Sequence, residues 1–183
     1  DSLALLKMFS DMNSGMPPQD GNGKKRPMEP TRLFLGAVVN NHKRHERELM
    51  PQYFKLAKKI ESGARFIINQ IGYDSRKQDE LLKYMVMRGL EVPVIANVYV
   101  LSAAAARYFH AGSIPGCIVT DELLAISERQ SQSADGGKQF FLEFAAKQCA
   151  IANGLGFRGV YLGGHLKYED YERILELTDS FAE

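Results

Sequence analysis

Apolar and polar positions along this chain follow two alternating patterns. Four short runs are predominantly apolar, at residues 33–39, 65–71, 92–99 and 158–162. Runs of this length are typical of strands that are buried on both faces. Between them, apolar residues recur every three to four positions, which predicts amphipathic helices. Strands and helices therefore alternate, as they do in an α/β protein with a parallel sheet covered by helices.

Capping and breaking residues mark the ends of the predicted helices. Pro51 is expected to open a helix over residues 52–62, because proline is tolerated at the first helical position. Asp74 or Ser75 is expected to cap a helix that runs to Arg88. The other predicted helices cover residues 3–12, 102–110, 121–129 and 138–153. A last amphipathic helix is predicted to have Tyr171, Ile174 and Leu175 facing inward.

The chain is expected to be a single α/β domain over residues 1–183, with a helix and a Pro/Gly-rich loop over residues 1–31 and four βα units over residues 32–183. The basic run Lys24, Lys25 and Arg26 is predicted to be a solvated part of that loop. A complete (β/α)₈ barrel needs about 250 residues. The pattern therefore fits either an open four-stranded sheet or a half or incomplete TIM barrel, and periodicity does not separate the two.

Composition narrows the class of protein. Hydrophobic residues make up 45% of the chain and the net charge is +1, so neither disorder throughout nor a polyanionic partner is indicated. No apolar run is long enough to span a bilayer. Cys117 and Cys149 lack metal-ligand spacing, and two reduced thiols suit a cytoplasmic protein. We expect no metal site, no nucleic-acid partner and no membrane partner.

Candidate binding residues gather where the predicted strands end, since ligands of parallel α/β folds bind at the carboxyl ends of the strands. Polar residues at those positions are Asn40, Asn41, His42, Gln70, Tyr73, Asp74, Asn97, Tyr99 and His165. Gln70 and Asn97 lie within otherwise apolar strands, where an unpaired amide costs about 1–3 kcal/mol. Either amide could bind an amide-bearing heterocycle or be satisfied by neighbouring backbone. The Gly163-Gly164-His165 turn could hold an anion or be a plain turn.

Residues 55–102 resemble the methylenetetrahydrofolate reductase family. That family has a barrel helix that ends before a Gly-Ala pair, a strand with a T-Q-x-x-[FY]-D motif and a following Val-Pro element. The matching residues here are Lys58, Lys59, Gly63, Ala64, Gln70, Tyr73, Asp74, Gly89, Val92 and Pro93.

The resemblance implies a (β/α)₈ fold with FAD at the carboxyl face and a folate stacked on the flavin. It implies an oxidoreductase that passes a hydride through the flavin to 5,10-methylenetetrahydrofolate and gives 5-methyltetrahydrofolate. Gln70 would bind the pterin, and Tyr73, Asn97 and Tyr99 would complete the substrate site. Lys58 and Lys59 would lie near the flavin phosphates, with Asn40 and His42 on the cofactor side.

Departures from the family pattern leave two functions open. The run VVNNHKR lacks the family's Pro-Glu, and the first half of the barrel, which supplies the family's catalytic glutamate, has no counterpart here. One reading is a fragment or relative of the reductase. The other is a non-catalytic or flavin-free folate-binding relative, or a partner subunit. Because a half barrel exposes apolar edges, we expect a homo-oligomer or a chain that supplies the other half.

Overall fold

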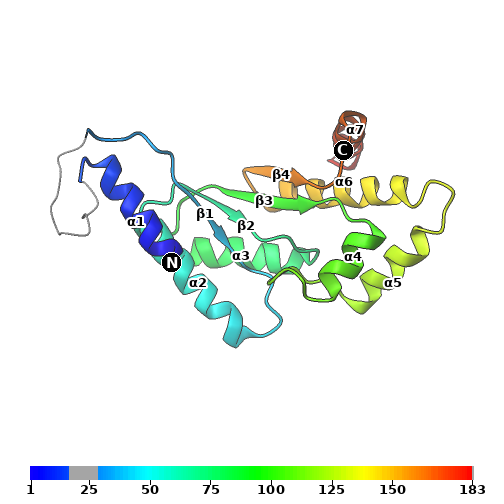
Figure 1. Cartoon of the computed structure of the whole chain (residues 1–183), viewed down its shortest axis with the longest axis horizontal. Helices are drawn as coiled ribbons and strands as arrows, with labels where there is room; N and C mark the ends of the chain where they lie inside the picture. Colours follow the sequence, from blue (N-terminus) through cyan, green and yellow to red (C-terminus); the bar gives the residue numbers. More distant parts are fainter. Residues whose placement is uncertain (17–28, 183) are drawn as a thin grey trace.

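The computed structural model describes residues 1–16 and 29–182 and contains one parallel sheet of four strands with helices between them (Figure 1). The strands are β1 (Gly36–Val39), β2 (Phe66–Asn69), β3 (Val94–Tyr99) and β4 (Gly159–Gly163). The helices are α1 (Ser2–Asn13), α2 (Glu46–Glu61), α3 (Ser75–Met87), α4 (Ala103–His110), α5 (Asp121–Gln130), α6 (Lys138–Leu155) and α7 (Tyr168–Ala182). The predicted α/β class is confirmed. Most of the predicted loop over residues 16–31, including Lys24, Lys25 and Arg26, falls outside the described residues.

The order of the strands in the sheet decides between the two predicted architectures. It is β1-β2-β3-β4, the same as in the chain, and every neighbouring pair is parallel. Crossovers between parallel strands are right-handed. When each new strand is added on the same side of the previous one, the connecting helices therefore all lie on one face of the sheet. In a doubly wound sheet the direction of addition reverses, so helices cover both faces. This arrangement is therefore that of half a (β/α)₈ barrel.

The two faces of the sheet differ in exposure. Ile67, Val94 and Ala96 point toward the helices and are at most 4% exposed. On the other face, Val38 of β1 is 50% exposed and Tyr161 of β4 is 58% exposed. We call this second surface the open face. It corresponds to the interior side of a barrel, and in the described residues no helix covers it.

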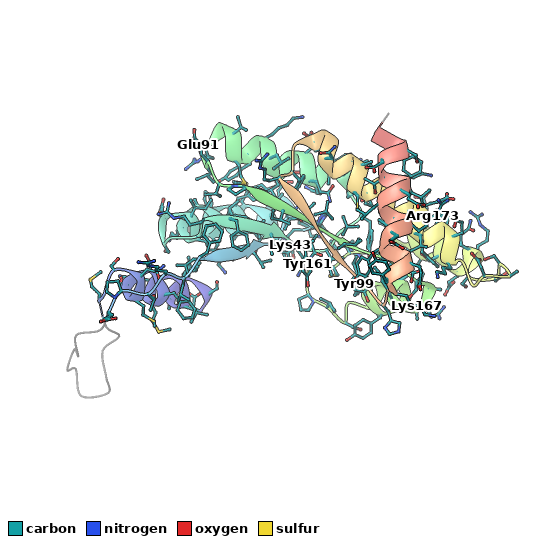
Figure 2. All side chains as sticks on the ribbon, turned by 90° about the horizontal axis from the view of Figure 1, so that it is seen from above. Lys43, Glu91, Tyr99, Tyr161, Lys167 and Arg173 are labelled. Atoms are coloured by element: carbon teal, nitrogen blue, oxygen red, sulfur yellow. The ribbon has the colours of Figure 1, made fainter. Side chains whose placement is uncertain are left out.

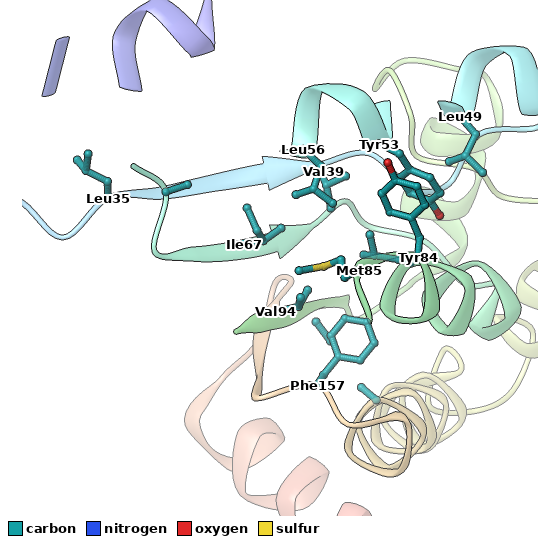
Figure 3. Close-up of a cluster of buried hydrophobic side chains, with 14 of the residues drawn as sticks. Leu35, Val39, Leu49, Tyr53, Leu56, Ile67, Tyr84, Met85, Val94 and Phe157 are labelled. Carbon is teal, nitrogen blue, oxygen red and sulfur yellow. The ribbon is translucent and has the colours of Figure 1, made fainter. Parts of the chain in front are cut away.

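The larger buried cluster lies between β1–β3 and the helices α2 and α3 (Figure 3). Leu49 and Leu56 of α2 are completely buried there, together with Ile67 of β2. The rings of Tyr53 and Tyr84 stack with their centroids 4.4 Å apart, which joins α2 to α3. Burial of these side chains holds the helices against the covered face of the sheet.

The helix α6 connects this cluster to a second one. The helix predicted over residues 138–153 is confirmed, and its apolar residues Phe141, Ala145, Cys149 and Ala152 are all buried. Phe141, Ala145 and Cys149 pack in the second cluster with residues from β3, α4 and α7, whereas Ala152 belongs to the first. α6 therefore fixes the two ends of the half barrel relative to each other.

The start of α2 differs from the prediction. The helix begins at Glu46 rather than at Gln52, so Pro51 lies inside it. Proline has no N–H, and the helical hydrogen bond to the carbonyl of Arg47 is lost on an exposed turn. The extra turn forms nonetheless because it carries Leu49, whose side chain is completely buried.

The predicted inward face of the last helix is only partly correct. Ile174 is 1% exposed, but Tyr171 is 37% exposed and Leu175 is 63% exposed. α7 packs mainly against α6, so only one side of it is covered. The pattern of apolar residues anticipated a second neighbour that the described residues do not supply.

Two further properties concern the class of protein. Cys117 and Cys149 are both buried free thiols. Among the helices that the structure describes, none combines the length and the apolar character needed to cross a bilayer.

Replacing Leu56 by alanine is expected to lower the free energy of unfolding by about 2–5 kcal/mol, because it empties a fully buried position between α2 and the sheet. Phe54→Ala is the matched control, since Phe54 lies on the same helix but is 53% exposed. Urea unfolding followed by circular dichroism measures both. Equal losses in the two variants would contradict the packing of α2 described here.

Candidate functional site

Polar side chains form a row across the open face near the carboxyl ends of the strands. Ile68 pairs with Ile95, and this register, continued by two residues past the end of the pairing, directs Gln70 and Asn97 to the same face. Asn97 in turn pairs with Tyr161. We call Gln70, Asn97 and Tyr161 the carboxyl-end row. In Figure 2, Tyr99 and Tyr161 lie toward the carboxyl ends of β3 and β4, whereas Glu91 lies at the opposite end.

The amide of Gln70 is partly satisfied by backbone. Its Oε1 accepts a hydrogen bond from the N–H of Ile71 at 3.0 Å, and its Nε2 donates to the carbonyl of Pro115 at a long 3.4 Å. An amide has two N–H donors and two acceptor lone pairs on its oxygen. One donor and one lone pair therefore remain for a ligand at this half-buried position.

Asn69 is a buried polar residue that the sequence interpretation missed. It is completely buried on the covered face, and its Oδ1 accepts a hydrogen bond from the backbone N–H of Asn97 at 2.6 Å. This bond fixes the backbone of β3 at the point where the Asn97 side chain enters the row. Alternation along Ile67, Ile68, Asn69 and Gln70 could have revealed it, since neighbouring residues of a strand point to opposite faces.

The two predicted tyrosines lie near the row but have structural contacts. The hydroxyl of Tyr73 donates to the carbonyl of Tyr99 at 3.2 Å, and its ring stacks on Phe144 at 5.8 Å. Burial raises the pKa of the Tyr73 phenol. The ring of Tyr99 meets Phe109 edge-on at 5.2 Å. Tyr73 therefore points away from the row and holds the β2–α3 loop against the end of β3.

His42 lies in the loop between β1 and α2 and is 3% exposed. Its ring packs against Gly72, where a side chain would collide with it. Its Nε2 has no hydrogen-bond partner within the described structure. Burial lowers the pKa of His42 from 6.5 to about 4, so the ring is neutral at pH 7. Asn40 is packed in a similar way against Gly116.

Lys58 and Lys59 lie in the last turn of α2, which leads to the amino end of β2. The Nζ of Lys59 donates to the carbonyl of Val38 at 2.7 Å, along the outer edge of β1. The side chain of Lys59 therefore reaches a point on β1 two residues before Asn40, whereas Lys58 is exposed. The predicted flavin site stays a prediction.

The Gly163-Gly164-His165 turn borders a cavity of about 460 Å³ next to the amino end of α6. Gly164 has a φ of 144°, and its backbone lies against Val100. Asp170 lies in this cavity and accepts hydrogen bonds from Lys138 Nζ at 2.6 Å and from the N–H of Lys167 at 2.9 Å. A carboxylate of the chain itself therefore already occupies the donors that an anion would need.

Comparison with known proteins supports the fold. No protein-family model and no curated protein matches the sequence. Among solved structures, the chain is similar to an uncharacterized protein from Clostridium thermocellum that binds two copies of 5-methyl-5,6,7,8-tetrahydrofolic acid. The TM-score is 0.54 at 14% identity, over 82% of this chain and 54% of that one. The chain therefore spans about half the length of that protein. At this identity the likeness shows the fold alone, and membership of the reductase family stays a prediction.

Because the imidazole of His42 is buried, we expect the stability of the fold to depend on pH. The unfolded chain takes up a proton at an ordinary pKa of 6.5, whereas folded His42 does so only near pH 4. Between these values the unfolded state binds more protons, so stability falls as the pH falls. From pH 7.5 to pH 4.5 we expect the free energy of unfolding to drop by up to about 3 kcal/mol through this group.

Urea unfolding at a series of pH values measures this drop. His42→Gln is expected to flatten the dependence between pH 6.5 and 4.5, while the control His165→Gln, at an exposed position, should retain it. An unchanged slope in His42→Gln would show that His42 is not the group responsible.

Proposed function

We propose that this chain binds a folate-type molecule at the carboxyl-end row of its open face. The observation that carries the proposal is the strand register, which directs the amides of Gln70 and Asn97 to the open face, together with Tyr161, the partner of Asn97 on β4. They lie on the uncovered side of a fold whose solved neighbour binds 5-methyl-5,6,7,8-tetrahydrofolic acid. In a parallel α/β fold, this edge of the sheet is where ligands bind.

The chemistry of the row suits a pteridine ring. Such a ring carries neighbouring N–H donors and acceptors along one edge, and amide side chains offer the complementary pair. Asn97 is half-buried, and its side chain makes no hydrogen bond to any residue that the structure describes, so both of its polar atoms are available. Ile68 and Ile95 lie beneath the row on the same face, and Tyr161 can offer a ring for stacking.

A bound ligand needs a second wall, because the open face by itself leaves one side of the row in solvent. β1 and β4 are the two ends of the sheet, and each has one unpaired edge in the described residues. The exposed Val38 and Tyr161 lie on these end strands. We infer that further βα units, from a second copy or another polypeptide, pair with these edges and enclose the site.

Reduction of a folate is the second candidate function, and the resemblance of residues 55–102 to the reductase family favours it. A bound FAD would supply the hydride for the methylene group of 5,10-methylenetetrahydrofolate. The side chains of the row are two amides and a phenol, so they can position a pterin but offer no carboxylic acid. The proton donor would therefore have to come from outside the row.

Substitution of the row tests folate binding. We expect Gln70→Ala and Asn97→Ala each to weaken the binding of 5-methyltetrahydrofolate about 5- to 30-fold, the loss expected for about 1–2 kcal/mol of hydrogen bonding. Isothermal titration calorimetry measures the dissociation constants. Glu91→Gln is the control, because Glu91 is exposed at the opposite end of β3 and its substitution should leave the affinity within twofold.

A loss of folate affinity is assigned to the row only in variants that are folded, that is, whose thermal unfolding midpoint lies within a few degrees of that of the unmodified chain. Unchanged folate affinity in both of them would remove the row as the site. Absence of saturable binding to the unmodified chain, at any oligomeric state that it forms, would contradict the proposal as a whole.

Flavin binding separates the two candidate functions. The visible absorption spectrum of the purified chain, recorded after incubation with FAD and removal of the excess, is the measurement. A flavin band that disappears when the flavin is chemically reduced and returns when 5,10-methylenetetrahydrofolate is added would support the reductase. Folate binding by a colourless chain would support the flavin-free reading.

A further inference from the structure

A second cavity, of about 390 Å³, lies outside the open face. It is bordered by the β1–α2 loop, by the amino-terminal turns of α3 and α5, and by Phe144 of α6. We call it the α3–α5 cavity. None of the residues of the carboxyl-end row lines it. Its volume is within the range of small-molecule sites, about 300–1,000 Å³.

Positive charge dominates the rim of this cavity. Lys43 and Arg44 form no ion pair with the described residues. Asp74 also borders the cavity, but its carboxylate is held by the side chain and the N–H of Arg76. Glu122 is the acidic residue whose charge stays without an ion-pair partner there.

Two helices begin at the cavity. Asp74 is the N-cap of α3 and Thr120 is the N-cap of α5, and both residues border the same space. The carboxylate of Asp74 already accepts the N–H of Arg76 at the start of α3, and Asp121 and Glu122 lie in the first turn of α5, so the attraction for an anion comes from Lys43 and Arg44.

The opposite wall is apolar. The stacked rings of Tyr73 and Phe144 border the cavity, together with Leu123 and Ile126 of α5. A small inorganic ion would leave this wall bare. The shape therefore suits a molecule with an apolar body and a single anionic end.

The β1–α2 loop also contains buried polar atoms without a hydrogen-bond partner in the described structure. They are the Nε2 of His42, which is 3% exposed and borders the cavity, and the Oδ1 of the completely buried Asn41. Both atoms are closed off from solvent, so they add nothing to the binding surface of the cavity.

We propose that the α3–α5 cavity is a second binding site, which takes a small organic anion with an aromatic or apolar body. Its carboxylate lies toward Lys43 and Arg44. Its body packs on Tyr73, Phe144 and Leu123.

Benzoate is the probe, and benzamide is its neutral isostere. Each is titrated into the ¹⁵N-labelled full chain at low ionic strength, and the ¹H–¹⁵N shifts of the cavity residues Thr120, Leu123 and Lys43 are followed. We expect benzoate to bind at least tenfold more tightly than benzamide, with the shifts confined to this cavity. Equal affinities, or benzoate shifts that map to the open face, would overturn the proposal.

Variants locate the charge recognition. The double variant Lys43→Glu, Arg44→Glu is expected to weaken benzoate binding at least tenfold, and Glu122→Gln to tighten it. Arg88→Glu is the matched control, since Arg88 is exposed at the other end of α3 and its reversal should change the affinity less than twofold. Unaltered affinity in the folded double variant would contradict the proposal. If that variant does not fold, the affinities of benzoate and benzamide for the unmodified chain test the proposal without it.

The test is independent of folate binding. Gln70→Ala should leave benzoate affinity unchanged, because Gln70 does not border this cavity. Benzoate binding that is lost in Gln70→Ala would assign the probe to the row and remove the second site.

Discussion

The addition of strands in chain order, always in the same direction, is the constraint on which the rest of this structure depends. Right-handed crossovers then place the connecting helices on one face of the sheet. That face becomes the core, where Leu56 and Ile67 are completely buried. The other face stays bare, and for this reason a molecule with an ordinary apolar content exposes Val38 and Tyr161 to solvent.

The same constraint creates the candidate site. Parallel strands end at the same edge, so residues far apart in the chain, such as Gln70, Asn97 and Tyr161, come to lie in one row. Asn69 contributes from the covered side by fixing the backbone of Asn97. The row therefore has a rigid strand support, although its ligand would still need a wall from further βα units.

The loops at this edge produce two different environments. On the open face, the amides of Gln70 and Asn97 lie among aliphatic side chains and suit a planar heterocycle. Behind it, the loop with His42 and the N-termini of α3 and α5 surround a cavity with a positive rim. The neighbour from Clostridium thermocellum shares the fold at 14% identity, so it provides a comparison for the sheet rather than for these side chains.

Local sequence determined the features that depend on nearby residues. The alternation of strands and helices, the caps at Asp74 and Thr120, and the buried stripe of α6 were all predictable, because hydrophobic period and capping act within a few positions. It also singled out Gln70 and Asn97 as amides within apolar runs. It did not reveal that both are directed to the open face, because that depends on strand register.

Only the tertiary structure decided the features that depend on distant partners. The choice between an open sheet and a half barrel needed the strand order. The early start of α2 needed the burial of Leu49, and the exposure of Leu175 depended on how little of α7 is covered. Lys58 and Lys59 fit a family pattern along the chain, but only the fold shows that Lys59 donates a hydrogen bond to the carbonyl of Val38 on the outer edge of β1. Sequence spacing measures distance along the chain, whereas a binding site depends on which elements the packing of the core brings together.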